Sequence, residues 1–477
     1  MTDAALAAHA RKTSTVQGVA AFALAFAALN LAAPNAFLAA MCLAVLAIGF
    51  ALLWRPGEAP VLLFVFLYQW LQTGISVFHA NLTGAPMVEY AAFGGDMPMA
   101  ITLCLAGLLA LAAGMRIGAG ARDPATLRQA RVTVLSQPIS RWFALYVQAA
   151  AVSFALLWVA IYAPGFYQPL LAVASLKWAF FFMLAYAAFV RGVGLNVYLV
   201  VAFLYELAVG LGGYFSEFKT VMFFTLLAAV MAGVRLRPRV LLAIGVIGAL
   251  LIASGVVWTA IKDDYRAFVS GDTGGQNVVV AVEARIEKFA ELAGALDETA
   301  LKDAANRTIR RLSYVDIFGV VLDRVPEFTP HARGALLLDA LTRPFLPRVL
   351  FPEKSVIDDT RRTIYYTGRL FTITRATSIS LGYMTELYID FGILGPMLVP
   401  AAFGFVYGLL YRTLVGWRRT GPLLGGALAC AILMPASLLE ISIAKLIGAL
   451  ATALLALAPF VVLVVPRWAP WTVARET

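Results

Sequence analysis

Charged side chains make up only 13% of the 477 residues, whereas hydrophobic ones make up 61%. A chain of this length with so few charges has too little polar surface to cover itself in water. A hydrocarbon core about 30 Å thick requires about 20 apolar residues per helix, and the sequence holds many such runs. Because a helix satisfies its own backbone hydrogen bonds, the composition predicts an all-α polytopic membrane protein.

Cysteine and histidine are also scarce, with three residues of each. Cys42, Cys104 and Cys430 lie inside apolar runs, so no disulfide framework is expected. The sequence has no phosphate-binding loop, nucleophile elbow, paired-cysteine zinc spacing or dinucleotide fingerprint in a suitable context. We therefore expect no cofactor, no metal and no coupling to nucleotide hydrolysis within this chain.

What is abundant is the apolar run, and hydropathy predicts about twelve transmembrane helices. The expected spans are Val16–Ala33, Ala36–Trp54, Val61–Phe78, Met99–Met115, Trp142–Tyr162, Leu170–Val190, Leu195–Tyr214, Phe218–Val234, Val240–Ile261, Ile393–Tyr411, Leu423–Leu439 and Ile443–Val465. They divide the chain into an N-terminal transmembrane region (1–261, about nine spans), a long polar loop (262–392) and a C-terminal transmembrane region (393–477, about three spans).

The distribution of Lys and Arg predicts the orientation, because cytoplasmic loops collect positive charge. Outside the long polar loop, nearly all basic residues fall in alternate connections that share a side with both termini. Both termini are therefore expected in the cytoplasm and the loop outside it, which in a bacterium means the periplasmic face of the inner membrane. This bias also explains most of the net charge of +10, so we expect no nucleic-acid partner.

The polar loop has the periodicity of helices. Apolar residues recur at helical spacing between Val278 and Leu292, again from about Glu298 to Leu322, and more briefly over Ala335–Leu341. Five prolines punctuate the stretch between Pro326 and Pro352. The loop is thus predicted to be an ordered, mostly helical cap.

Ionisable groups inside apolar spans are costly and are therefore candidates for function. Lys177 and Glu206 lie within predicted spans and can pair with each other, either as a structural ion pair or facing a substrate. Lys445 lies near the end of its span, where its ammonium can reach the interface.

A glycine-rich break, Gly210–Thr220, interrupts two apolar runs and includes Glu217 and Lys219. A helix beginning after Ser216 would aim free N–H groups and Lys219 at an anion, although a tight hairpin would also need these glycines.

Arginines are numerous in the polar loop. Guanidinium groups match phosphate oxygens, so several converging near the membrane would suit a diphosphate, whereas the many acids nearby favour ordinary salt bridges for some of them. The candidates are Arg307, Arg310, Arg311, Arg348, Arg361, Arg362, Arg369 and Arg375.

Three side chains are candidates for a general base. Glu386 and Asp390 are four residues apart, so they would share a helix face at the bilayer surface, in a catalytic role or a capping one. His331 is the single histidine of the polar loop. The adjacent Asp358 and Asp359 could contribute to a cation site only with further ligands.

Several of these segments resemble the O-antigen polymerase (Wzy-type) family. The similar segments are Leu346–Lys354 (LPRVLFPEK), Thr377–Tyr383 (TSISLGY) and Glu386–Gly395 (ELYIDFGILG), together with the glycine-rich break and the large loop before the last spans. The sequence departs from the family's pattern at Ser355, at Asp390 and at Glu217, where the family tends to have proline, asparagine and a Ser-Arg pair.

The resemblance implies a metal-independent membrane glycosyltransferase of GT-C-like architecture. Its substrate would be an undecaprenyl-diphosphate-linked oligosaccharide, joined to a growing polysaccharide outside the cytoplasm, with membrane lipid and a chain-length regulator as further partners. Three alternatives remain. The first is an O-antigen-ligase-like glycosyltransferase with a different acceptor, and the second is a polysaccharide or lipid transporter (flippase), which the buried Lys177 and Glu206 would suit. The third is a structural scaffold for an envelope complex, in which the arginine-rich loop would dock a partner.

Overall fold

A computed structural model describes residues 3–121, 124–192, 196–212, 219–234, 238–271, 280–346, 351, 353, 357–368, 370, 379–468 and 470–472. The helices of its first half are α1 (Asp3–Leu29), α2 (Ala36–Leu53), α3 (Val61–Thr83), α4 (Met87–Tyr90), α5 (Met97–Ala119), α6 (Pro124–Leu135), α7 (Ile139–Tyr162), α8 (Tyr167–Ser175), α9 (Lys177–Val190), α10 (Val197–Gly212), α11 (Lys219–Met231) and α12 (Pro238–Val269). Those of the second half are α13 (Val282–Gly294), α14 (Glu298–Leu312), α15 (Asp316–Arg324), α16 (Ala335–Thr342), α17 (Asp359–Tyr366), α18 (Tyr383–Phe391), α19 (Leu394–Gly416), α20 (Gly421–Leu433), α21 (Ile443–Pro459) and α22 (Val465–Trp468). The described residues contain no strand, so the all-α prediction is confirmed.

Seven helical stretches are long and apolar enough to cross a membrane, which makes the chain a multi-pass membrane protein. They are Ala36–Leu53, Val61–Thr83, Met97–Ala119, Ile139–Tyr162, Tyr167–Val190, Leu394–Gly416 and Ile443–Trp468. The prediction of about twelve full-length spans is therefore wrong for the part of the chain that is described. Four others are apolar but shorter, Thr13–Leu29, Val197–Gly210, Lys219–Met231 and Gly421–Ser437. At 1.5 Å per residue they are shorter than a 30 Å hydrocarbon layer.

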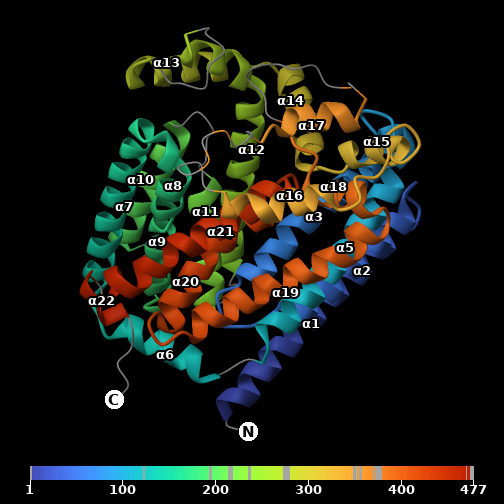
Figure 1. Ribbon diagram of the computed structural model, residues 1–477. Coiled ribbons are helices and arrows are strands. Elements are labelled where there is room, and N and C mark those ends of the chain that lie inside the picture. Colours follow the sequence, from blue (N-terminus) through green and yellow to red (C-terminus); the bar gives the residue numbers. More distant parts are fainter. Residues whose placement is uncertain are drawn as a thin grey trace.

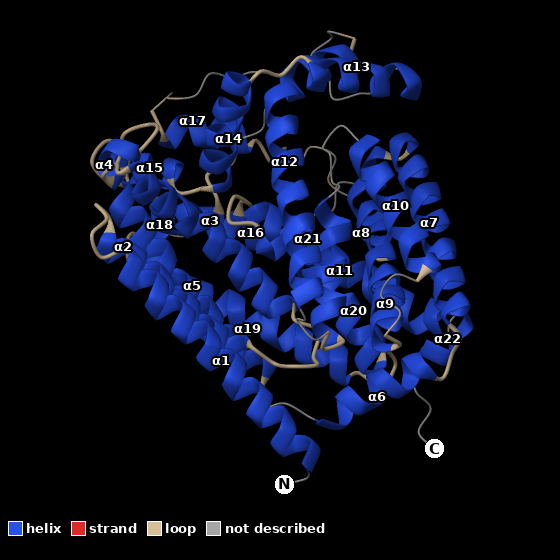
Figure 2. Cartoon of the chain, turned by 180° about the vertical axis from the view of Figure 1, so that it is seen from behind, coloured by secondary structure: helices blue, strands red, loops and turns tan. Residues whose placement is uncertain are grey.

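Most helices of the polar loop lie toward one end of the molecule, whereas α16 lies nearer the middle, beside α21 (Figure 1). In Figure 1, α13, α14, α15 and α17 lie at the end opposite to both chain termini. The view from behind shows the same arrangement, with α6 and the termini at the other end (Figure 2). The predicted amphipathic stretches correspond to α13, α14 with α15, and α16, except that a break at Ser313–Val315 divides the second one.

Helices α5 and α19 pack against each other, and glycine makes their close approach possible. A Cβ on Gly114 would lie 2.0 Å from the carbonyl oxygen of Ala401, and one on Gly404 would lie 2.1 Å from that of Leu111. Gly118 and Gly408 repeat the pattern one turn further on, at 2.2 and 2.3 Å. Small residues four apart on both helices let backbones touch in lipid, where apolar burial contributes little to association.

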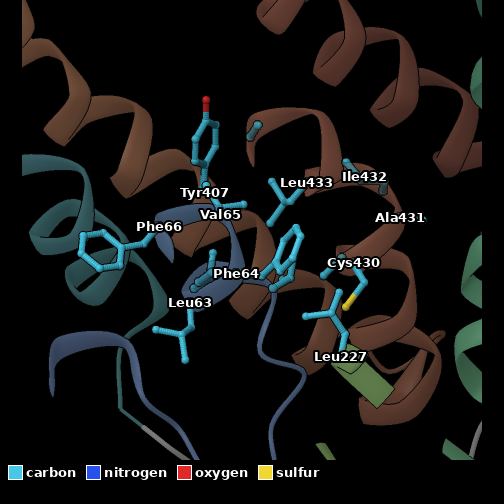
Figure 3. Close-up of a cluster of buried hydrophobic side chains, with 14 of the residues drawn as sticks. Leu63, Phe64, Val65, Phe66, Leu227, Tyr407, Cys430, Ala431, Ile432 and Leu433 are labelled. Atoms are coloured by element: carbon cyan, nitrogen blue, oxygen red, sulfur yellow. The ribbon is translucent and has the colours of Figure 1, made fainter. Parts of the chain in front are cut away.

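One part of the apolar core lies where α3 meets the C-terminal helices. Figure 3 shows Leu63–Phe66 of α3 beside Leu227 of α11, Tyr407 of α19 and Cys430–Leu433 of α20. These side chains are buried, so the core joins the first spans to the last ones. This part of the core therefore packs the first turns of α3 against the C-terminal end of α20.

Candidate functional site

A network of charged side chains lies where the polar-loop helices meet the N-terminal end of α21. Glu386 of α18 is 1% exposed, and both of its carboxylate oxygens have partners. Arg362 of α17 donates from Nη1 to Oε1 at 2.9 Å, and the backbone N–H of Ile443 donates to Oε2 at 2.7 Å. Glu386 thus binds the first turn of α21, where a negative charge is favoured by the helix dipole.

Asp339 extends this network toward solvent. Its Oδ2 lies 2.9 Å from Nε of Arg343 and 3.6 Å from Nη2 of Arg362. Arg343 follows α16 directly, in a short 3-10 turn labelled η2 (Arg343–Phe345), so the Asp339–Arg343 pair has i,i+4 spacing. Arg362 is therefore shared between a buried carboxylate and a partly exposed one.

Asp359 and Lys445 form a second ion pair beside the first. The ammonium of Lys445 lies 2.7 Å from Asp359 Oδ2, and Ser442 Oγ donates to the same oxygen at 3.3 Å. The Asp359 side chain is 1% exposed, whereas that of Lys445 is 46% exposed. The neighbouring Asp358 accepts instead from the backbone N–H of Arg361 and caps α17, so the two adjacent carboxylates have separate roles.

The segment that leads into α21 is anchored to α3. Gln69 Nε2 donates to the carbonyl of Ala436 at 2.6 Å, and its Oε1 accepts from the hydroxyl of Tyr383 at 2.7 Å. Gln72 donates to the Glu440 carboxylate and accepts from the backbone N–H of Leu439. These contacts hold α18 and the start of α21 together at the level of the charged network.

The other two proposed catalytic groups have structural partners. Both oxygens of Asp390 accept backbone N–H groups at the start of α16, from Leu336 at 3.0 Å and from Leu337 at 2.8 Å. His331 Nδ1 lies 3.2 Å from the Ile389 carbonyl, and its ring packs edge-on against Tyr388. Asp390 therefore caps α16, one of the two roles that the sequence left open, and His331 is held against the end of α18.

Burial dominates the electrostatics of the two acids of α18. It raises the pKa of Glu386 above its ordinary value, although Arg362 and the Ile443 N–H act in the opposite direction. Burial likewise raises the pKa of Asp390 against the N–H groups of α16. For Arg362, burial lowers the pKa, but Glu386, Asp339 and Asp359 raise it by more, so this guanidinium stays charged.

The raised pKa of Glu386 predicts a pH-dependent free energy of unfolding. A carboxyl whose pKa is higher in the folded state binds its proton more tightly there, so protonation stabilises the fold. This stabilisation is fully present below the unfolded-state pKa of about 4, and it is lost as the pH rises through the higher folded-state pKa. We expect Glu386→Gln to flatten this part of the profile in thermal unfolding of the detergent-solubilised protein. An identical pH profile for wild type and variant would contradict the assignment.

Four of the predicted arginines, Arg307, Arg310, Arg361 and Arg362, have described side chains. Of the arginines on the described helices, Arg362 joins the charged network. Arg310 of α14 lies instead over the ring of Tyr90, 5.1 Å from its centroid. The side chains of Arg307 and Arg361 are exposed and make no ion pair with a described residue. Lys219, also exposed, is the first residue of α11.

Several predicted site residues lie outside the described residues. They are Glu217, Arg348, Arg369, Arg375 and the side chain of Arg311.

Lys177 and Glu206 pair with each other inside the helix bundle, as the sequence suggested. Lys177 Nζ lies 2.7 Å from Glu206 Oε2, and Tyr146 of α7 donates to Oε1 at 2.8 Å. The Glu206 side chain is 2% exposed, and the three residues come from α9, α10 and α7. The triad therefore ties three helices together through polar contacts in an apolar environment.

Replacing one member of this triad should destabilise the bundle. Lys177→Met leaves the Glu206 charge with only the Tyr146 hydroxyl, at an expected cost of about 2 kcal/mol. Thermal unfolding in detergent measures this loss, and the double variant Lys177→Met with Glu206→Gln should recover most of it. Lys302→Met is the control, because the Lys302–Glu298 pair is solvent-exposed and should contribute nothing measurable. Equal melting temperatures for all four proteins would contradict the prediction.

Apolar side chains stand exposed on the elements that carry the charged network. Phe345 is 81% exposed, and Leu338 and Leu341 of α16 are 63% and 47% exposed. Helix α16 packs against α18 and α21, so these side chains project from the same short segment that holds Asp339 and Arg343. Charged and apolar surfaces therefore adjoin where the polar helices meet the apolar ones.

Five residues of the network were not predicted as catalytic or diphosphate-binding residues: Asp339, Arg343, Asp359, Ser442 and Lys445. The i,i+4 spacing of Asp339 and Arg343 is a signal that the sequence carried. No comparable signal joins Asp359 to Lys445, because their contact depends on where α17 packs relative to α21.

One family model matches the chain, and its match covers residues 127–443, from α6 to the first residue of α21. The matched region includes the Lys177–Glu206 pair and all of the charged network except Lys445. No curated protein and no solved structure matches the chain. Because the match covers more than half of the sequence, the chain belongs to the family described as a domain of unknown function (DUF8712).

Proposed function

We propose that this protein is a membrane glycosyltransferase that polymerises oligosaccharide units linked to undecaprenyl diphosphate, outside the cytoplasm of a bacterium. The observation that carries the proposal is the adjacency of the charged network to the exposed Leu338, Leu341 and Phe345. A lipid-linked sugar has an apolar tail, an anionic diphosphate and a polar glycan, so its site needs cations and carboxylates beside an apolar surface. The sequence resemblance to O-antigen polymerases favours the same substrate.

Two cations of the network are suited to the diphosphate. Lys445 is 46% exposed and Arg362 is 20% exposed at the side chain, so both can reach a ligand. Each now neutralises a carboxylate, and a bound diphosphate would compete for the same positive charge. In glycosyl transfer these cations would counter the negative charge that develops on the departing lipid diphosphate.

Deleting the gene tests the proposed activity directly. We expect the surface glycan of the deletion strain to carry single repeat units in place of a polymer. Returning the wild-type gene to this strain should restore the polymer length. Polymer of normal length in the deletion strain would contradict the proposal.

Binding of the lipid carrier is expected to depend on Lys445. Lys445→Met should weaken binding of undecaprenyl diphosphate at least tenfold in native mass spectrometry, because a charge-assisted contact is lost. Binding of undecaprenyl monophosphate should change less, and Lys302→Met serves as the matched control. Equal binding of the diphosphate by wild type and Lys445→Met would contradict this role.

A second candidate, a lipid or polysaccharide transporter, is favoured by the buried Lys177–Glu206–Tyr146 triad. Proteoliposomes distinguish the two functions. Translocation of the lipid-linked unit with no change in its glycan length would favour the transporter, whereas elongation without translocation would favour the transferase.

A further inference from the structure

One buried carboxylate oxygen of the charged network accepts no hydrogen bond from the described residues. Asp359 Oδ2 is bonded to both Lys445 and Ser442, but Oδ1 accepts no hydrogen bond from any described residue, although it is shielded from solvent. Buried carboxylate oxygens in folded proteins are nearly always satisfied, because stripping them of water is costly. The vacant lone pairs of Oδ1 therefore point to a donor that the described part of the chain does not supply.

The other acids of the region lack this feature. Glu386 has one donor on each oxygen, Arg362 and the Ile443 N–H, and Asp390 has the Leu336 and Leu337 N–H groups. Both carboxylates are thus used in holding helices in place. Asp359 alone among these three acids combines deep burial with a vacant acceptor, and its cation is the most exposed one of the network.

We propose that Asp359 Oδ1 receives the hydroxyl group of the acceptor sugar and acts as the general base of glycosyl transfer. This inference rests on the proposed function. The half-exposed Lys445 is placed to engage the diphosphate, and its movement toward that anion would open the carboxylate to the glycan. Glu386, which the sequence made a candidate base, is then a positioning residue that orients Arg362 and α21.

The reaction balances without a metal or a further reactant. The acceptor hydroxyl oxygen forms a bond to the anomeric carbon of the donor as the bond from that carbon to the diphosphate oxygen breaks. The bonding pair leaves with the lipid diphosphate, and the hydroxyl proton passes to Asp359 Oδ1 and then to water. The products are the extended glycan and free undecaprenyl diphosphate.

The test uses purified full-length protein with lipid-linked units extracted from the deletion strain, followed by glycan sizing. We expect Asp359→Asn to lower the turnover number at least 100-fold, the ordinary contribution of a general base. Binding of undecaprenyl diphosphate should be retained or strengthened, because the carboxylate no longer competes for Lys445. Asp359→Ala should regain activity when acetate is added, because a small carboxylate can occupy the vacated space. A purely structural carboxylate would show no such rescue.

The outcomes separate the two proposals. If wild type elongates the glycan and Asp359→Asn elongates it equally fast, Asp359 is not the base and the polymerase assignment stands. If wild type neither elongates the units nor binds undecaprenyl diphosphate, both proposals fail. If Asp359→Asn does not fold, Asp359→Glu replaces it in the test. This variant keeps the negative charge beside Lys445 but moves the carboxylate oxygen away from the position of Asp359 Oδ1. Its turnover should fall at least tenfold with diphosphate binding retained, and unchanged turnover would overturn the inference.

Discussion

Gly404→Ala should lower the free energy of unfolding by about 3 kcal/mol or more, because the added Cβ would lie 2.1 Å from the carbonyl oxygen of Leu111. This neighbour is backbone, so no side chain can rotate away and α5 and α19 must move apart. Gly114→Ala should have an effect of similar size, since its Cβ would meet the Ala401 carbonyl at 2.0 Å. Thermal unfolding in detergent measures both losses.

The matched control for these variants is Gly448→Ala on α21, where an added Cβ meets nothing within 4 Å. Alanine is the better helix former, so this variant should melt at the wild-type temperature or slightly above it. If Gly404→Ala behaves like Gly448→Ala, the close packing of α5 on α19 is wrong.

Arg362→Met should cost about 3–5 kcal/mol of stability, because it leaves Glu386, which is 1% exposed, without its cation. The same change should abolish elongation, since Arg362 also holds α17 against α18. Arg362→Lys keeps the charge but not the planar fork, so it should recover stability only in part. Thermal unfolding and glycan sizing on the same samples check both effects.

A double-mutant cycle with Glu386→Gln isolates the ion pair within this prediction. Once the carboxylate is neutral, the further loss caused by Arg362→Met should be much smaller. Purely additive effects would mean that the two side chains do not interact. Arg361→Ala is the neighbouring control for stability, because its exposed side chain makes no ion pair with a described residue.

Composition and periodicity were sufficient to predict the fold class and the helical polar segment. Long apolar runs required helices, and the amphipathic stretches correspond to α13–α16. The number of full-length spans was overestimated because hydropathy does not locate helix ends. Helices α10 and α11, which contain the apolar segments Val197–Gly210 and Lys219–Met231, are themselves too short to cross the hydrocarbon layer.

The candidate site was predicted only where contacts are local or where a charge lies within a span. The Lys177–Glu206 pair could be suggested because a charge inside a span requires a partner. The pairing of Arg362 with Glu386, and of Asp359 with Lys445, depends on how α17, α18 and α21 pack. Sequence spacing does not predict which side chains of different helices meet. The arginines were therefore expected to bind one diphosphate together, whereas Arg310 packs over the ring of Tyr90.

The glycine contacts between α5 and α19 bear on the order in which the chain is assembled. The ribosome completes α5 early, but α19, whose surface fits the glycines of α5, is made only after the long polar segment 262–392. Until α19 is inserted, the face of α5 that carries Gly114 and Gly118 must be covered by lipid or by a chaperone. Chains truncated before residue 394 would expose the glycine-lined face of α5 to membrane quality-control proteases.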